Sequence, residues 1–208
     1  MTFFPDRLFD GADAYADAYF EQVRKAQASV DGSSIVAAVT LLKEAINRGA
    51  TLYSCGNGGS AAISNHLVCD CLKGVSVGTE LRPRVHSLST SIELITAIVN
   101  DIGVEEMFSL PLRSLGRGGD VLIVISSSGR SRNIIRALET AAELGMKTIA
   151  LTGFDGGDAA GMATVSLHVD ADNYGVCEDV HQSLMHILAQ ALRHSSLINP
   201  DDLGRVRF

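Results

Sequence analysis

One stretch near the middle of the chain constrains the fold most, because it reads as strand, loop, helix and strand in succession. Residues 121–125 are β-branched and aliphatic without polar alternation, which predicts a strand buried on both faces, as in a parallel sheet. Residues 133–144 carry apolar side chains at helical spacing, and residues 147–151 return to strand character. The sequence therefore predicts a β-loop-α-β unit of an α/β fold.

The loop of this unit, residues 126–131, has the sequence SSSGRS. A loop at the carboxyl end of a parallel strand that opens a helix offers free backbone N–H groups and the positive end of a helix dipole. Gly129 permits a tight turn, and the four serine hydroxyls can donate hydrogen bonds without filling the space. This chemistry suits a phosphate or a phosphosugar, although an isolated motif of this kind is equally typical of an ordinary helix-capping turn.

A second unit of the same design lies earlier in the chain. A predicted strand at residues 51–55 is followed by Gly56-Asn57-Gly58-Gly59-Ser60 and a predicted helix at residues 61–72. This loop lacks the lysine and spacing of a P-loop and the dinucleotide-binding glycine pattern. Because loops at the carboxyl edge of one parallel sheet face the same crevice, we expect the two loops to share a site.

Histidines and carboxylates are spaced along two predicted helices. His66 and Asp70 are four residues apart, and Glu178, Gln182 and His186 follow one side of a predicted helix at residues 178–193. Two histidines and two carboxylates could ligate a divalent metal or form an acid/base pair. The spacing alone favours ordinary structural or surface roles for these histidines.

Composition restricts the class of protein. The 208 residues suffice for one α/β domain, and the net charge of −7 without a dense basic cluster argues against a nucleic-acid partner. No apolar run reaches membrane-spanning length, and no secretory signal pattern opens the chain, so we expect no membrane partner. The four cysteines (Cys55, Cys69, Cys71 and Cys177) suggest no disulfide framework; we expect them to be reduced and mostly buried in a cytoplasmic protein.

Two amphipathic helices are predicted before the first strand, at residues 10–29 and 33–47, with Ser33 or Ser34 capping the second. Their apolar faces must be buried against the sheet or against another subunit; we expect both, which predicts oligomerisation. We therefore divide the chain into an N-terminal helical arm (1–48), a main domain (49–194) and a polar C-terminal tail (195–208).

The remaining segments complete a sheet of five strands. Strands are predicted at 84–88 and 164–169, a helix at 91–99, a turn at Asn100-Asp101, a helical segment at 105–115 interrupted by Pro111, and a loop at 153–157. His181 and His194 are expected at the solvent or at an interface.

Five runs of sequence together carry a family resemblance: CGNGGSAAISNH, the Asn100-Asp101 pair, GDVLIVISSSGRSRNII, GMKTIALTGFDGG and EDVHQSLMHIL. From about residue 49 to 192 the chain resembles a sugar-isomerase (SIS) domain, most closely the phosphoheptose isomerase branch. The resemblance implies an α/β, flavodoxin-like three-layer αβα sandwich with a five-stranded parallel sheet, and a homotetramer with sites between subunits. It also implies isomerisation of sedoheptulose 7-phosphate to D-glycero-manno-heptose 7-phosphate through an enediol, in the synthesis of heptose precursors of surface polysaccharides.

The resemblance assigns roles to individual residues. The substrate and its phosphate would be held by Asn57, Gly58, Ser60, Asp101, Ser126, Ser127, Ser128 and Ser131. A metal, zinc in the family, would be held by His66, Asp70, Glu178 and His186. The catalytic residues would be Asp70, Glu178 and His186.

The chain departs from the family at several of these positions. Asp70 replaces the catalytic glutamate and is one methylene shorter, a displacement that can cost orders of magnitude in rate. Glu178 replaces a glutamine ligand, so it is either the base or a stronger ligand. Arg130 replaces an asparagine in the serine loop, Lys73 only partly replaces a substrate-binding arginine, and Gly175 stands where an aspartate is common.

Three functions remain open at this stage. The first is a phosphoheptose isomerase or an isomerase of a different phosphosugar. The second is a non-catalytic SIS protein that binds a phosphosugar or a protein partner. The third is an amino-sugar isomerase, for which 208 residues leave no room for the usual second domain.

Overall fold

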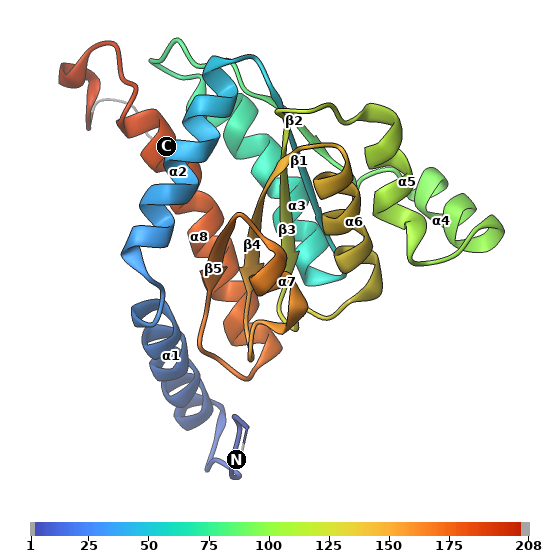
Figure 1. Ribbon diagram of the computed structural model, residues 1–208. Coiled ribbons are helices and arrows are strands. Elements are labelled where there is room, and N and C mark those ends of the chain that lie inside the picture. Colours follow the sequence, from blue (N-terminus) through green and yellow to red (C-terminus); the bar gives the residue numbers. More distant parts are fainter. Residues whose placement is uncertain (1–2, 205–208) are drawn as a thin grey trace.

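The computed structural model describes residues 3–204 and has a central sheet of five parallel strands (Figure 1). The strands are β1 (Thr51–Gly56), β2 (Arg84–Ser87), β3 (Val121–Ser126), β4 (Lys147–Thr152) and β5 (Val165–His168). Their order across the sheet is β2-β1-β3-β4-β5, and every neighbouring pair is parallel. The predicted α/β class and five-stranded parallel sheet are confirmed.

Helices cover both faces of the sheet and make a three-layer sandwich. They are α1 (Ala12–Ala28), α2 (Gly32–Asn47), α3 (Gly59–Cys69), α4 (Ile92–Asp101), α5 (Glu106–Leu115), α6 (Arg132–Glu143), α7 (Gly157–Met162) and α8 (Tyr174–His194). α2, α3 and α8 pack on one face, and α5, α6 and α7 pack on the other. α4 lies at the margin of the molecule beside α5 (Figure 1).

The central strand β3 explains why the sheet needs helices on both sides. Val121, Ile123 and Ile125 enter the core with α2, α3 and α8, whereas Leu122 and Val124 enter the core with α5 and α6. All five side chains are buried, and each contributes about 1.5–3 kcal/mol by leaving water. The uninterrupted apolar run in the sequence is thus the consequence of a strand with no solvent face.

The connections after β1 and β3 diverge at the carboxyl edge of the sheet. β1 leads into α3 on one face, and β3 leads into α6 on the opposite face. Since β1 and β3 are neighbours, their loops separate and leave a crevice between them, the usual binding position in open α/β sheets. The structure therefore brings the two predicted loops to the same edge.

Three local predictions around the helices are wrong. Asn100 and Asp101 are the last two residues of α4, not a turn after it. α5 continues through Pro111, which lacks only the N–H that an ordinary residue would donate to the Met107 carbonyl. The cap of α2 is Asp31, whose Oδ1 accepts the backbone N–H of Ser33 at 3.0 Å, and not Ser33 or Ser34.

Two further elements differ from the prediction. The helix expected to reach residue 72 is regular only to Cys69, after which the chain forms a π-helix, η1 (Asp70–Val75). Short π-helical segments are rare and frequent at functional sites. The six-residue helix α7 was not predicted, because its small residues give no apolar periodicity.

His181 was expected at the solvent or at an interface, and this is wrong. It lies on α8 with no exposed surface, and burial lowers its pKa to about 4, so it is neutral at physiological pH. His181 lies on the apolar side of α8, among the buried residues of that helix. His194 is exposed, as expected. All four cysteines are free, and Cys69 is the exposed one.

The helix α1 and the segment after α8 both contact the rest of the described fold. Tyr19 on α1 donates a hydrogen bond to Asp179 on α8 at 2.8 Å. In the tail, the Ile198 backbone N–H donates to the Gly78 carbonyl at 3.0 Å, and residues 205–208 lie outside the described residues. Among the helices of residues 3–204, none is both long enough and apolar enough to cross a membrane.

Candidate functional site

A cavity of about 110 Å³ lies at the carboxyl edge of the sheet, where the loops after β1 and β3 meet. Its lining consists of Asn57, Ser60, Ile125, Ser126, Ser127, Ser128, Ser131, Tyr174 and Glu178. Six of the predicted substrate residues are therefore brought together, and Glu178 joins them from the start of α8. Tyr174, the first residue of α8, also lines the cavity, although no sequence pattern predicted it; it packs against Phe154 with ring centroids 4.8 Å apart.

The polar groups of the cavity suit an anion. The Ser127 hydroxyl is buried, and it has no hydrogen-bond partner among the described residues. Ser131 is the N-cap of α6, yet its side chain makes no capping hydrogen bond. Free hydroxyls beside the N-termini of α3 and α6 are the arrangement that binds phosphate.

Glycine geometry keeps this region compact. Gly58 and Gly129 have φ angles of 54° and 62°, which disfavour other residues. A Cβ on Gly129 would also lie 2.7 Å from the Gly156 carbonyl carbon, so a larger residue would push the loop after β3 away from the loop after β4. Gly58 is the N-cap of α3 and positions its first turn.

An amide pair connects the two loops across the crevice. Asn57 Nδ2 donates to Asn133 Oδ1 at 3.0 Å, and Asn133 Nδ2 donates to Asn57 Oδ1 at 2.8 Å. Asn133 was not predicted as a site residue, because its partner is 76 positions away and no local pattern marks it. The pair fixes the width of the crevice between the loops.

Two residues with proposed roles near the phosphate lie elsewhere. Arg130 pairs with the Asp155 carboxylate on the loop before α7, and it does not line the cavity. Asp101 is exposed at the end of α4, where its Oδ1 accepts a hydrogen bond from Asn100 Nδ2 at 2.6 Å. The structure does not bring Asp101 to the cavity of its own chain.

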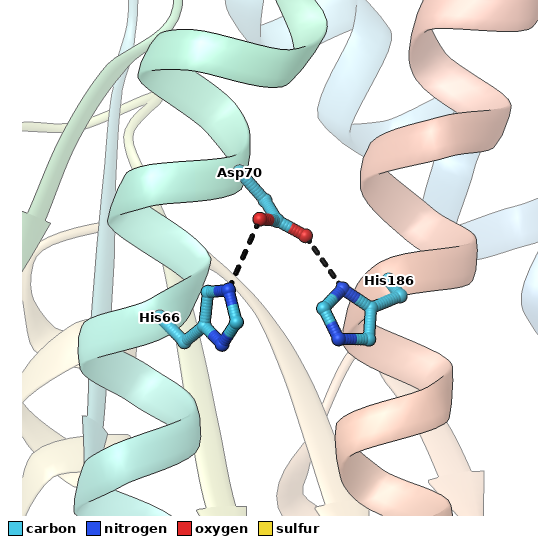
Figure 2. Close-up of side chains that lie close together, drawn as sticks. All are labelled: His66, Asp70 and His186. Carbon is cyan, nitrogen blue, oxygen red and sulfur yellow. Dashed lines mark hydrogen bonds and ion pairs between the residues drawn. The ribbon is translucent and has the colours of Figure 1, made fainter. Parts of the chain in front are cut away.

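A carboxylate–imidazole group lies further along α3 and α8 (Figure 2). Asp70 stands between two histidines: His66 Nε2 is 3.3 Å from Asp70 Oδ1, and His186 Nδ1 is 2.7 Å from Asp70 Oδ2. The three side chains offer one ligand atom each within 4.8 Å of one another, so they could hold a metal ion. The structure thus assembles three of the four residues predicted as metal ligands.

The fourth predicted ligand, Glu178, is not part of this group. Its carboxylate lies against Gly59 at the start of α3, where a Cβ on Gly59 would be 2.5 Å from Glu178 Cδ. Burial, and then the nearby Asp179 charge, raise the pKa of Glu178. Eight residues of helix separate it from His186, a rise of about 12 Å, which places Glu178 at the cavity end of α8.

Gln182 takes the position next to the histidines. Its Nε2 lies 2.9 Å from His186 Nε2 and 3.4 Å from His66 Nδ1. Helical spacing predicts Gln182 on the same side of the helix as His186 but indicates no role for it.

A serine-lined cavity at a parallel-sheet edge is typical of α/β domains that bind phosphorylated small molecules. The family described as SIS domain matches residues 14–153. A phosphoheptose isomerase of Geotalea daltonii is 40% identical over 158 residues, 76% of this chain and 82% of its own. The structure of phosphoheptose isomerase GmhA from Neisseria gonorrhoeae has a TM-score of 0.78 and 33% identity, covering 86% of this chain and 95% of that one.

A phosphoheptose isomerase structure from Francisella tularensis gives a TM-score of 0.82 at 30% identity, and it covers 88% of this chain and 99% of that one. The chain therefore belongs to the SIS-domain family, in its phosphoheptose isomerase branch.

Proposed function

We propose that the protein isomerises sedoheptulose 7-phosphate to D-glycero-manno-heptose 7-phosphate. The proposal rests on one observation: the same two helices, α3 and α8, contribute residues to the serine-lined cavity at one end and to the Asp70 group at the other. A phosphosugar can then be held at its phosphate while its other end meets carboxylates and imidazoles. The curated relatives named as phosphoheptose isomerases support this substrate.

The phosphate would occupy the cavity between the two loops. Ser126, Ser127, Ser128 and Ser131 would donate hydrogen bonds, with Ser60 and Asn57 from the opposite loop. The unpartnered Ser127 hydroxyl supports this position because a buried donor without a partner costs about 1–3 kcal/mol. The helix N-termini supply the positive potential that the acidic chain lacks in bulk.

The chemistry of the donor set fits a zinc ion, which we propose as the cofactor. Two imidazoles and one carboxylate are ligands that catalytic zinc sites commonly use, with a position left open. His66, Asp70 and His186 would hold the ion. When bound, it would polarise the sugar carbonyl and stabilise negative charge on the enediolate oxygens.

We assign the base to Glu178 rather than Asp70, with C1 and C2 of the sugar lying between the Glu178 carboxylate and the Asp70 group. Isomerisation needs a base that removes a proton from C1 of the ketose and returns it to C2. Both oxygens of Asp70 are engaged with histidines, whereas Glu178 lines the cavity and makes no hydrogen bond or ion pair with the described residues. Its raised pKa also moves it toward the operating pH, where a general base is most effective. His186 would exchange protons with the sugar oxygens.

We further propose a homotetramer in the cytoplasm that supplies heptose precursors of surface polysaccharides. An open groove lined by apolar side chains of α2 and α8, including Ile35, Val36 and Ile187, supports burial against another copy. Free cysteines suit a reducing compartment. Asp101, remote from its own cavity, would serve a neighbouring subunit. The division into arm (1–48), SIS domain (49–194) and tail (195–208) remains part of this proposal.

The test is turnover of sedoheptulose 7-phosphate by purified protein, metal-free and with added zinc, while solvent deuterium entry at C2 of the product is followed. Zinc-dependent product with deuterium at C2 is expected. Binding of the phosphosugar without exchange would contradict the heptose assignment. That result would instead favour another phosphosugar or a non-catalytic role.

A further inference from the structure

The side chain of Gln182 closes a ring of four residues. Asp70 contacts His66 Nε2 and His186 Nδ1, and the Gln182 amide contacts the two remaining ring nitrogens, His66 Nδ1 and His186 Nε2. Each imidazole therefore lies between the carboxylate on one side and the amide on the other. The two rings are perpendicular, with centroids 5.1 Å apart.

The hydrogen bonds of this ring favour one tautomer for each histidine. A carboxylate only accepts, so His66 Nε2 and His186 Nδ1 must carry the hydrogens that face Asp70. An amide NH₂ group only donates, and it has two hydrogens for the two nitrogens that it faces. In these tautomers each imidazole donates to Asp70 and accepts from the Gln182 amide.

A metal held by Asp70 and both histidines requires the opposite arrangement. The ion would take the nitrogens that face Asp70, which then carry no hydrogen, and the hydrogens move to the nitrogens that face Gln182. A half-turn of the amide about its Cγ–Cδ bond replaces the NH₂ group by Oε1, which has two lone pairs to accept both N–H groups. Metal-binding histidines generally donate their second N–H to such an acceptor.

We propose that Gln182 is the positioning residue of the metal site, and that its amide orients both histidines by donating to them without metal and accepting from them with metal. This inference rests on the metal set of the proposed function. A single amide serves both ligands because Gln182 lies one turn before His186 on α8 and faces His66 on α3. Glu178, at the cavity end of α8, is not part of this ring of four residues.

Two substitutions of Gln182 test the proposal because only one of them should weaken metal binding. Gln182→Met keeps the length but removes the amide, and metal affinity should fall about 10–100-fold. Gln182→Glu keeps an acceptor for both N–H groups, and it should retain or increase metal affinity. If Gln182 had only a structural role, both substitutions would change the metal affinity in the same direction. That result would overturn the proposal. Gln27→Met, at an exposed position of α1, is the control of the same residue type and should leave the affinity unchanged.

The readouts are equilibrium titration with Co²⁺ and Zn²⁺ and the visible spectrum of the Co²⁺ form. At saturation, Gln182→Met should keep the band positions of the wild-type protein, because Gln182 is not itself a ligand. Shifted bands would show direct coordination and overturn the positioning role. In metal-free protein, long-range ¹H–¹⁵N spectra should report hydrogens on His66 Nε2 and His186 Nδ1; the reverse tautomers would contradict the ring.

These measurements separate the proposal from the proposed function. If the wild-type protein binds no metal, the metal set itself fails, whatever the tautomers show. If the wild-type protein binds metal and Gln182→Met binds equally well, the metal set stands and the role of Gln182 is refuted.

Discussion

Gly59 offers a way to displace the Glu178 carboxylate without changing its chemistry. A Cβ at position 59 would lie 2.5 Å from Glu178 Cδ and 2.6 Å from Oε1. Nonbonded carbon atoms pack at about 3.5–4.0 Å, so Gly59→Ala must push the carboxylate back by roughly 1 Å. Misplacement of a catalytic group by that distance can reduce the rate by about 10²-fold. We expect kcat to fall by about this factor.

The fold should tolerate Gly59→Ala. Gly59 is the first residue of α3, its φ lies outside the left-handed region, and the group that its Cβ would meet is the flexible end of a side chain. Replacing glycine by alanine in a helix stabilises it by roughly 0.5–1 kcal/mol, which for a chain of this size raises Tm by about 1–4 °C. The variant should therefore be stable and nearly inactive.

The assay is steady-state turnover of sedoheptulose 7-phosphate with a parallel thermal melt. Gly32→Ala is the matched control, since Gly32 is the first residue of α2 and its Cβ would meet nothing within 4 Å. Glu178→Gln should lose at least as much kcat as Gly59→Ala. Wild-type kcat in both Gly59→Ala and Glu178→Gln would refute Glu178 as the base and return that role to Asp70.

Three other outcomes follow from the contacts described. Ser127→Ala should weaken the binding of inorganic phosphate about 10–100-fold, because hydrogen bonds to charged groups contribute about 1.5–3 kcal/mol. Tm should not change, since the hydroxyl has no partner among the described residues. Calorimetric titration measures the affinity, and an unchanged affinity would remove Ser127 from the site. Asp120→Asn should lower Tm by several degrees, because the buried carboxylate accepts hydrogen bonds from the backbone N–H groups of Thr51 and Arg117, each at 2.8 Å. An unchanged Tm in a thermal melt would contradict this role of Asp120. Hydrogen bonds from Ser109 and Arg113 lower the pKa of Glu106 to about 2, so its stabilising contribution is complete above the unfolded pKa of about 4.3 and is lost as the pH falls toward 2. Urea midpoints of the wild type and Glu106→Gln should therefore differ at pH 6 and converge near pH 2, and a constant difference would argue against the depressed pKa.

The parts of the structure that follow from local pattern were predictable. Uninterrupted apolar runs identified strands buried on both faces, and the glycine- and serine-rich loops after β1 and β3 identified the edge where they meet. Parallel strands present their carboxyl ends at one edge of the sheet. This rule predicted the position of the cavity and six of the residues that line it.

The parts that depend on how distant elements pack were not predictable. Glu178, Gln182 and His186 share one side of α8, but the axial offset between α3 and α8 decides which of them meets His66, and helical spacing contains no information on that offset. The Asn57–Asn133 pair likewise depends on a contact between residues 76 positions apart. The burial of His181, by contrast, follows from its place on the apolar side of α8 and could have been predicted. Asp31 replaced the expected serine cap because its carboxylate accepts from Ser33 in the first turn.

The common direction of α3 and α8 has a consequence for substrate size. Glu178 contacts Gly59 at one end of the helix pair, and His186 contacts Asp70 at the other end. Residues later in either helix therefore lie farther from the phosphate cavity. Ser60 and His66 are six residues apart, which corresponds to about 9 Å of helix. The helix pair therefore sets the length of sugar phosphate that can react. Across sugar phosphates with increasing numbers of carbons, the affinity conferred by the phosphate should stay constant, while turnover should rise once the chain is long enough to place C1 and C2 between Glu178 and the Asp70 group. Equal turnover at every length would contradict this.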